Sequence, residues 1–309
     1  PAGRTMKQVH FVHAGHAYLP ELQAYAGHLA QLGHTCHVHT RPDSVPEQAN
    51  VVWWMCGRVH RAHSQRLHRS LQVHEYASAS VGHWPAAKDR LKRWLHPRPD
   101  HRVFQSEWVR QRMGFDDDVN WSLRDMAVPG HFLRARREHE PDVDLVYLGE
   151  MRRLLEFVPV LRALLDAGLR LLLVGQAPAA LLSQLAGRPG LLAHGPVPQE
   201  QVPAQLLRAR AGLNLMPARL PLTQQTSTKV LEYMAVGLPV ISNPYPWIER
   251  YAHAHPQRLL LVDDLLSASS WQALSLRWPG LDAQRTCWQG LTWEQCLQGM
   301  PLWRSLVLA

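Results

Sequence analysis

The sequence has no apolar run close to the ~18 residues that a membrane-spanning helix requires. It also has no charged and then apolar leader at its start, so we expect a soluble protein that is not secreted. Cysteine is scarce and has no paired spacing, which excludes a disulfide framework and a CxxC metal site and favours the reducing cytoplasm. The four cysteines are Cys36, Cys56, Cys287 and Cys296.

Apolar residues are plentiful, since 46% of the 309 residues are hydrophobic. Such a composition excludes disorder for most of the chain, and the length is typical of roughly two domains. Positive charge is concentrated in the first part: residues 1–140 hold 19 Lys and Arg against 13 Asp and Glu, and the remainder holds 14 against 12. A basic surface favours an anionic partner, which can be nucleic acid, acidic lipid or a phosphorylated substrate.

Alternating strand and helix patterns run through the first half. Residues 7–14 indicate a strand that ends at Gly15, and residues 20–32 indicate a helix that Gly33 closes. Further strands are predicted over 34–40, 51–55, 71–74 and 102–105, the last leading into a helix over 106–113. This alternation predicts a parallel sheet that helices cover on both faces.

The pattern restarts after a charged stretch, residues 134–144, which we interpret as a linker between two domains. Strands are predicted over 144–148, 169–174, 190–193, 212–216 and 238–241, and helices over 157–167, 181–186, 202–210 and 228–236. We therefore predict an α/β protein with two doubly wound domains, residues 6–138 and 142–288. Ligands of such sheets bind at the carboxyl ends of the strands, so we expect a cleft between the two domains.

The most informative stretch, residues 224–242, places a polar loop before a helix and a buried strand. Free N–H groups at the start of the helix form an anion site, to which Lys229 adds a full positive charge. Glu232, about one turn further on, presents a carboxylate that can accept two hydrogen bonds from a ribose 2′,3′-diol. The alternative is that residues 226–228 only cap the helix and that Glu232 lies in solvent.

Residues 229–242 resemble the nucleotide-sugar signature of retaining glycosyltransferases with the two-Rossmann GT-B architecture, of the family-4 type (glycosyl transferases group 1). Less specific segments resemble other parts of that family in the same order, namely 30–38, 101–110, 146–150, 172–175, 194–197 and 291–294. The last resembles the start of a helix that crosses back to the first domain. Residues 289–309 are therefore expected to form a helical segment returning to it.

The resemblance implies an enzyme that moves a sugar from a nucleoside diphosphate sugar, of the UDP or GDP type, to an acceptor hydroxyl with retention. It assigns the ribose to Glu232 and the nucleobase to Gly175 and Val197. It assigns the donor diphosphate to the helix start, that is, to Thr226, Ser227, Thr228 and Lys229. Members also tend to carry an Arg and a Lys after the first donor-domain strand, and this chain departs from that pattern. Arg152 or Arg153 can substitute, with Arg153 preferred; the alternative is that both lie on a solvated helix face. No cofactor or metal is implied, because N–H groups and cations neutralise the leaving diphosphate.

Gln224 departs from the family pattern. Members often carry a Glu eight positions before the ribose Glu, where it touches the transferred sugar. An amide can still bind a sugar hydroxyl, but it lacks the charge that helps stabilise an oxocarbenium ion. We expect catalytic roles for Gln224 and for His74, which occupies the place where members often carry a His near the donor sugar.

Three more residues of the first domain are candidates. Gly15 and His16 are expected in a loop that approaches the acceptor or a phosphate, and Glu75 is expected to contact acceptor hydroxyls. The plain alternatives are a turn glycine and an ordinary surface or core position. A metal is not predicted, because His37 and His39 share one strand face while Cys36 lies on the other.

Residues 88–98 combine cations with Leu91, Trp94 and Leu95. Such a stretch can lie on an anionic membrane or pack as an ordinary helix, and both readings stay open. The resemblance and the basic first domain favour a glycan or lipid-linked acceptor and a cytoplasmic protein. A peripheral location at the inner face of the membrane stays open. Two other functions remain: a nucleotide-sugar-binding protein with lost or weak catalysis, and a basic nucleic-acid-binding protein. The second lacks support, because no aromatic platforms interleave with the charge.

Overall fold

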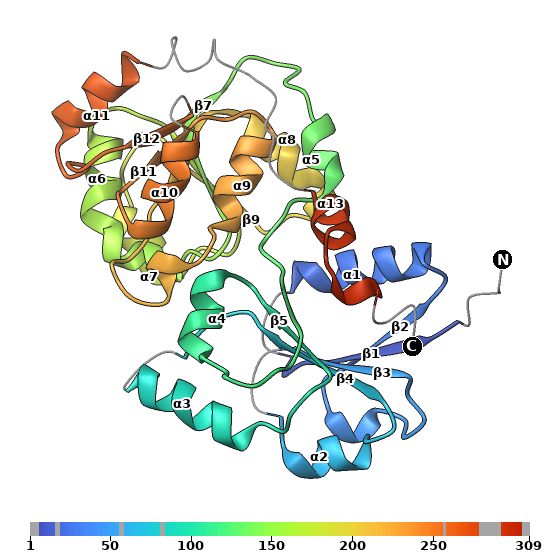
Figure 1. Ribbon diagram of the computed structural model, residues 1–309. Coiled ribbons are helices and arrows are strands. Elements are labelled where there is room, and N and C mark those ends of the chain that lie inside the picture. The colour runs from blue at the N-terminus through green and yellow to red at the C-terminus, as the bar shows by residue number, and fades with distance from the viewer. Residues whose placement is uncertain are drawn as a thin grey trace. The chain divides into compact units, whose positions relative to one another are not determined.

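The computed structural model describes residues 6–15, 19–55, 59–80, 84–255, 258–277 and 292–304. The chain divides into two compact units, the first made of residues 1–127 and 291–309 and the second of residues 128–290. Each unit is built around one six-stranded sheet (Figure 1). In both sheets all neighbouring strands are parallel.

The sheet of the first unit has the strand order β2-β1-β3-β4-β5-β6. Its strands are β1 (Gln8–Val12), β2 (Thr35–His39), β3 (Val51–Met55), β4 (Leu71–Tyr76), β5 (His101–Phe104) and β6 (Trp121–Leu123). Its helices are α1 (Pro20–Gln31), the 3-10 turn η1 (Pro42–Ser44), α2 (Arg61–Arg66), α3 (Pro85–Leu95), α4 (Glu107–Met113) and α13 (Trp293–Gln298). Helices α1 and α13 lie on one side of the sheet, and α2 and α3 lie on the other (Figure 1).

Burial explains the order of these strands. Every residue of β3 is buried, as expected for the continuous apolar run Val51–Met55 in a strand covered on both faces. In the core, Trp53 of β3 packs against Phe11 of β1 and Tyr25 of α1. Strand β2 lies at the edge, and its alternating polar residues stay at least partly exposed.

The sheet of the second unit has the order β12-β11-β10-β7-β8-β9. Its strands are β7 (Val143–Leu148), β8 (Leu171–Val174), β9 (Leu191–Gly195), β10 (Ala209–Asn214), β11 (Val240–Ser242) and β12 (Leu259–Leu261). Its helices are α5 (Gly130–Arg134), α6 (Val158–Asp166), α7 (Ala179–Leu185), α8 (Val202–Leu207), α9 (Thr228–Ala235), α10 (Pro246–Ala254) and α11 (Ala268–Ser275), with the 3-10 turns η2 (Arg152–Phe157), η3 (Gln199–Gln201) and η4 (Leu222–Gln224). Counted from its first strand this is the order 3-2-1-4-5-6, so the winding reverses between β7 and β10.

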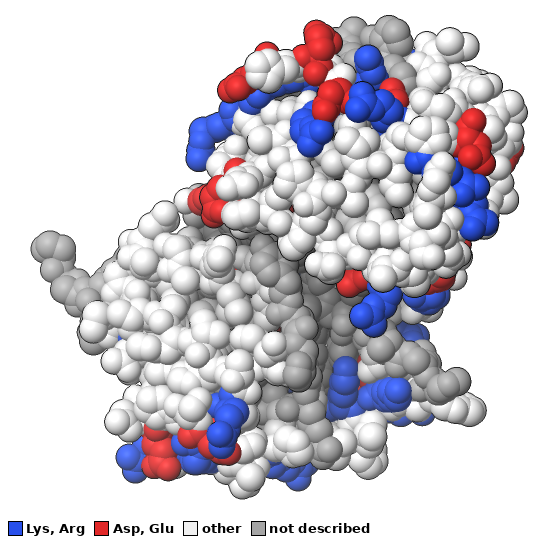
Figure 2. All heavy atoms as spheres, turned by 180° about the vertical axis from the view of Figure 1, so that it is seen from behind, with Lys and Arg blue, Asp and Glu red and all other residues white. Residues whose placement is uncertain are grey.

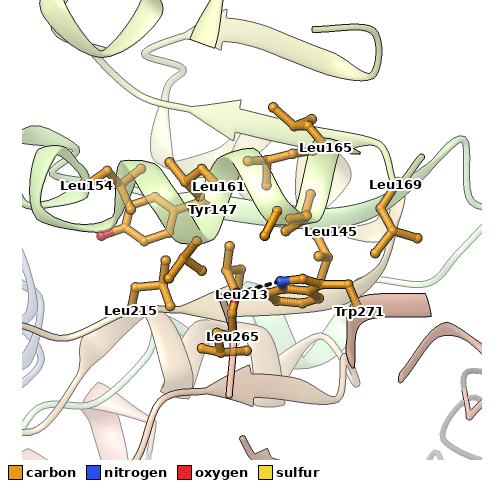
Figure 3. Packing of buried hydrophobic residues seen from close by; sticks show 14 of the residues in the cluster. Leu145, Tyr147, Leu154, Leu161, Leu165, Leu169, Leu213, Leu215, Leu265 and Trp271 are labelled. Carbon is orange, nitrogen blue, oxygen red and sulfur yellow. Dashed lines mark hydrogen bonds between the residues drawn. The ribbon is translucent and has the colours of Figure 1, made fainter. Parts of the chain in front are cut away.

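The core of the second unit fills the space between this sheet and its helices (Figure 3). Leu145 and Leu213 point from neighbouring strands toward Leu161 and Leu165 of α6. Trp271 of α11 is fully buried there, and its indole N–H donates to the carbonyl of Leu265 at 2.9 Å. The indole therefore brings an apolar body into the core without leaving its donor unpaired.

The predicted α/β class with two doubly wound sheets is confirmed. Several boundaries differ, however. The units divide at residues 127 and 128 rather than within 134–144, because α5 already packs against α9 in the second unit and Phe132 is buried. The helix predicted over 202–210 ends at Leu207, because Ala209 and Ala211 are buried in β10. The edge strands β6 and β12 and the helices α10 and α11 had no strong enough pattern to be predicted.

The close approach of α9 to β10 yields a test of this packing. A Cβ at Gly212 would clash with the fully buried ring of Tyr233, because it would lie only 2.7 Å from Cε2. We expect Gly212→Ala to lower the free energy of unfolding by about 1 to 3 kcal/mol, because overpacking forces the helix away from the strand. Urea denaturation followed by circular dichroism measures this.

The matched control is Gly27→Ala on α1, where a Cβ would meet nothing within 4 Å. Helix propensity predicts that this variant gains up to about 1 kcal/mol. Equal stability of Gly212→Ala and the wild type would show that α9 does not pack on β10 as described.

Candidate functional site

The carboxyl ends of β7 and β10 meet where the winding of the second sheet reverses. In open parallel sheets this is where ligands bind. Strand β10 ends at Asn214, and the chain returns through η4 to begin α9 at Thr228. The residues singled out by the sequence between 224 and 232 are therefore placed at this point of the sheet.

Buried polar groups fix the loop that precedes α9. The Ser227 hydroxyl donates to Asn214 Oδ1 at 3.1 Å, and the Asn214 amide donates to Ser242 Oγ at 2.8 Å and to Tyr245 Oη at 3.0 Å. Asn214 and Ser242 have no exposed surface, so these bonds replace water that the groups have lost. The hydroxyl of Ser227 is consequently turned toward the sheet, and only its backbone can serve the predicted anion site.

The start of α9 keeps its amide donors available. No side chain caps the helix, and the first N–H of α9 to bond within the backbone is that of Val230, which donates to the Ser227 carbonyl at 3.0 Å. The N–H groups of Thr228 and Lys229 come earlier in the chain and have no partner within the helix, as at the start of any helix. Thr226 and Thr228 are half-buried beside them.

Lys229 lies on Tyr147 at the end of β7. Its ammonium donates to Tyr147 Oη at 2.6 Å and lies 3.8 Å from the centre of the ring. Tyr147 Oη in turn donates to the carbonyl of Glu150 at 3.2 Å. Burial, and next the positive charge of Arg153, lower the pKa of Lys229 from 10.5 to about 7. An anion beside this ammonium would reverse that shift.

The two predicted arginines have different surroundings. Arg153 is half-buried and close enough to act electrostatically on Lys229, Tyr147 and Tyr245. Arg152 is exposed. Two cations, Lys229 and Arg153, thus face the same small region together with the start of α9, and they repel each other there. Such a region favours a multivalent anion such as a diphosphate.

Glu232 lies one turn along α9 from Lys229 and is half-buried. Burial raises its pKa from 4.5 to about 8, and the nearby Lys229 opposes this rise. No hydrogen bond or ion pair to another described residue holds its carboxyl group. A partly buried carboxyl without a protein partner is suited to bind the hydroxyls of a ligand.

Glycines open the strand ends on the other side of β7. Gly149 and Gly175 follow β7 and β8 with φ of 97° and 131°, in the region that favours glycine. A Cβ at Gly175 would lie 2.8 Å from the Gly149 carbonyl oxygen, so the backbones meet closely here. Val197, two residues after β9, is half-buried. The predicted base contacts of Gly175 and Val197 stay a prediction.

Gln224 ends η4, half-buried, and its side-chain oxygen accepts from Arg250 of α10 at 3.0 Å. A glutamate at this position would pair with the same guanidinium. The structure therefore gives Gln224 a local partner that the sequence alone did not suggest.

The candidates of the first unit lie apart from this arrangement in the sequence and are mostly internal. His74 is in the body of β4 with 1% of its surface exposed, and burial, with the charges of His96 and Arg102, lowers its pKa to about 3. Its Nε2 has no hydrogen-bond partner among the described residues. His74 is therefore neutral near pH 7 and not presented to solvent.

Glu75 requires a correction. Its carboxylate is buried, accepts from Trp53 Nε1 at 2.7 Å and from Tyr25 Oη at 3.1 Å, and is paired with Arg124. These partners occupy the group inside the core of the first unit, so it does not reach an acceptor hydroxyl as predicted. Gly15, with a φ of 79°, forms a turn in which its N–H donates to His13 Nδ1. His16 lies outside the described residues.

The described ranges contain neither a metal-ligand cluster nor a membrane-spanning helix. No group of three or more His, Cys, Asp or Glu side chains there is arranged to hold a metal ion. No helix there is long and apolar enough to cross a bilayer.

Sequence reasoning missed Tyr147, Asn214 and Tyr245. Tyr147 was visible only as one apolar position of a buried strand, and its contact with Lys229 spans 82 residues. A signal for Asn214 existed, because a lone amide at the end of an otherwise apolar strand indicates a polar partner at the strand end.

Residues 143–271 match the family described as Glycosyl transferases group 1. No curated protein matches the sequence. Several solved structures have the same fold at low sequence identity. One is AviGT4, a glycosyltransferase involved in avilamycin A biosynthesis, with 14% identity, a TM-score of 0.60 and coverage of 98% of this chain and 97% of that one.

A glycosyltransferase from Rickettsia africae has 10% identity and a TM-score of 0.63, with 95% of this chain and 96% of that chain covered. The Anabaena protein HepE, in complex with UDP and glucose, has 10% identity and a TM-score of 0.60, with coverage of 91% and 93%. At these identities the likeness concerns the fold, which is GT-B. Helix α9 and Glu232 lie within the segment that matches this family, residues 143–271, and the chain as a whole has the GT-B fold.

Proposed function

We propose that the protein transfers a sugar from a nucleoside diphosphate sugar to an acceptor hydroxyl. The observation that carries the proposal is the start of α9, where available N–H groups, Lys229 and Arg153 adjoin the unpartnered carboxyl of Glu232. A nucleoside diphosphate joins a diphosphate to a ribose diol, so one ligand can contact both the helix start and Glu232. The family match of residues 143–271 supports this assignment of the donor.

In the proposed reaction the bond between the anomeric carbon and the diphosphate oxygen breaks, the acceptor oxygen bonds to that carbon, and the acceptor proton passes to the leaving diphosphate. Thr228 and Lys229 N–H groups and the Lys229 and Arg153 side chains stabilise the charge that develops on the leaving diphosphate. The donor is of the UDP or GDP type, and the Anabaena structure in complex with UDP and glucose favours UDP for the first assay. Retention of the anomeric configuration is part of the proposal.

We also propose that the transfer needs no metal ion, and the same geometry supports this. A leaving diphosphate needs neutralisation, which a divalent cation supplies in many enzymes. Here two basic side chains and a helix start supply positive charge. We further propose a glycan or lipid-linked acceptor, for which the basic first unit provides the support.

Gln224 favours a second candidate, a nucleotide-sugar-binding protein with little turnover. Its amide is held by Arg250 and carries no negative charge for a developing oxocarbenium ion. Binding of a donor without hydrolysis or transfer separates this candidate from the enzyme.

The proposal predicts release of nucleoside diphosphate from a UDP-sugar or a GDP-sugar in the presence of EDTA. A coupled assay for released UDP or GDP, run across a panel of donor sugars with and without a simple sugar acceptor, measures it. The rate should be unchanged by EDTA, because the charges that hold the diphosphate belong to the protein. An absolute requirement for Mg or Mn would refute this mechanism, and binding without any turnover would support the binding protein.

Glu232→Ala should weaken binding of UDP by about 1 to 3 kcal/mol, the range for hydrogen bonds to a group that can carry charge. Isothermal titration of UDP and of its 2′,3′-dideoxy analogue into wild type and variant measures the coupling between the carboxyl group and the diol. The analogue should bind both proteins equally.

The matched control for this titration is Glu249→Ala, since Glu249 is an exposed carboxylate on α10 of the same unit. It should bind UDP as the wild type does. An equal loss for UDP and for the dideoxy analogue in Glu232→Ala would move Glu232 away from the ribose.

Lys229 predicts the pH dependence of donor binding. Its pKa in the free protein is about 7, and a bound diphosphate favours the protonated form, so affinity must fall as pH rises above 7. The fall is at most about tenfold per pH unit, since one proton is involved. UDP-glucose is the suitable probe, because its diphosphate does not titrate in this range.

The titration is best performed in Glu232→Gln, which removes the neighbouring carboxyl that titrates near pH 8. Adding Lys229→Arg, whose charge persists at all these pH values, should flatten the profile. A profile that keeps its slope with arginine would assign the proton to another group.

A further inference from the structure

Helix α3 has its apolar side chains turned outward. Trp84 at its N-cap, Leu91 and Trp94 are 81%, 55% and 80% exposed. They follow one another at helical spacing with the exposed Ala87, so they form one stripe along the helix. We call these four residues, Trp84, Ala87, Leu91 and Trp94, the α3 stripe.

Charged side chains attach the opposite face of α3 to the first unit. Asp89 is buried, accepts from the Ser80 N–H at 3.0 Å and lies 3.8 Å from Arg112 Nε of α4. The guanidinium of Arg93 packs over Gly114, at the end of the same helix α4. Helix α3 therefore departs from the usual surface helix, because large apolar side chains face water while charged ones hold the opposite face to the protein.

Cations border the α3 stripe on both sides. At 100° per residue Lys88 falls on one flank of the stripe and Arg90 on the other, and both are exposed. At the end of the helix, Arg61 donates to the Trp94 carbonyl at 3.3 Å and adds a third cation. Figure 2 shows Lys and Arg atoms gathered on this part of the first unit.

The backbone conformation of Trp84 is a second, independent observation that sets this surface apart. Trp84 has a φ of 56°, the single positive value outside glycine among the described residues. Bulky residues avoid this conformation because of its steric cost. Trp84 is nevertheless 81% exposed, so packing against the described residues offsets little of this steric cost.

We propose that α3 docks the protein on an anionic lipid surface, with the α3 stripe inserted at the level of the headgroups. Trp and Leu gain from leaving water there, and Arg90 and Arg61 can reach lipid phosphates around them. A second copy of the chain fits less well, because two such faces would bring like charges together. Nucleic acid fits less well too, since phosphates offer Leu91 no apolar surface to contact.

The inference goes beyond the proposed function and does not depend on it, since lipid binding is measured without a donor. Cosedimentation with vesicles of phosphatidylcholine alone, or with one third phosphatidylglycerol, gives the partition coefficient. We expect binding to the anionic vesicles only, weakened at high ionic strength. Leu91→Ser combined with Trp94→Ser should lower the coefficient by about tenfold or more, and Arg90→Glu by roughly tenfold.

Two controls keep the type of change and move its place within the first unit. Trp121→Ala removes a half-exposed indole of β6 that Arg110 already covers, and Arg69→Glu reverses an exposed charge beyond α2. Both should bind vesicles as the wild type does, and far-UV circular dichroism checks that every variant is folded.

The proposal fails if wild type binds neutral and anionic vesicles alike or not at all, or if the Leu91 and Trp94 double variant binds like wild type. It also fails if sedimentation velocity shows a dimer that this double variant abolishes, which would assign the stripe to a second copy. Salt-sensitive binding to duplex DNA that Arg90→Glu removes, without binding to vesicles, would assign the basic flank to nucleic acid.

Discussion

A single buried guanidinium organises the first unit. Arg124 has no exposed surface and is paired with Glu75, while a second bond, at 3.3 Å, reaches Glu21 of α1. Burial raises the pKa of Glu21, which moves the trio toward one positive and one negative charge. Removing one partner of a buried ion pair costs about 3 to 5 kcal/mol, because the remaining charge has neither a partner nor water to solvate it. Glu75 also holds Trp53 and Tyr25, so strands β3 and β4, helix α1 and the segment after β6 share this one charge.

The second unit relies on polar bonds of another kind. Tyr233 of α9 accepts from the Leu148 N–H at 2.9 Å and donates to the Leu213 carbonyl at 3.3 Å, which joins the helix to the ends of β7 and β10. Its ring rests on Gly212, the only kind of residue that leaves room for it. The helix start is thereby set between two strand ends, and Asn214 sets the loop before it. This rigid placement keeps Lys229 and Arg153 close together although they repel each other, as the predicted anion site requires.

The sequence predicted those features that depend on neighbours along the chain. The strand and helix periods gave both sheets, and the stretch before Thr228 placed Lys229 and Glu232 one turn apart on the same helix. Their contacts with a diphosphate and a ribose stay a prediction. Contacts between distant segments could not be predicted. Glu75 looked like a site residue beside His74, but successive strand residues face opposite sides, and its partner Arg124 lies 49 residues further on. Helix α3 was ambiguous for the same reason, because the pattern of its residues does not say which face the unit covers. Burial of Asp89 decides that question.

The path of the chain has a consequence for the order in which the protein is completed. Residues 128–290 form the whole of the second unit, whereas the first unit needs both its opening 127 residues and the segment from 291 onward. Helix α13 packs on α1, and its Trp293 ring lies 5.8 Å from the guanidinium of Arg124. A chain synthesised from its N-terminus therefore completes the second unit while the first still lacks α13. Packing of α13 on α1 then joins segments that lie far apart along the chain. Until α13 leaves the ribosome, the apolar side chains of α1 that it covers stay open to water and to chaperones.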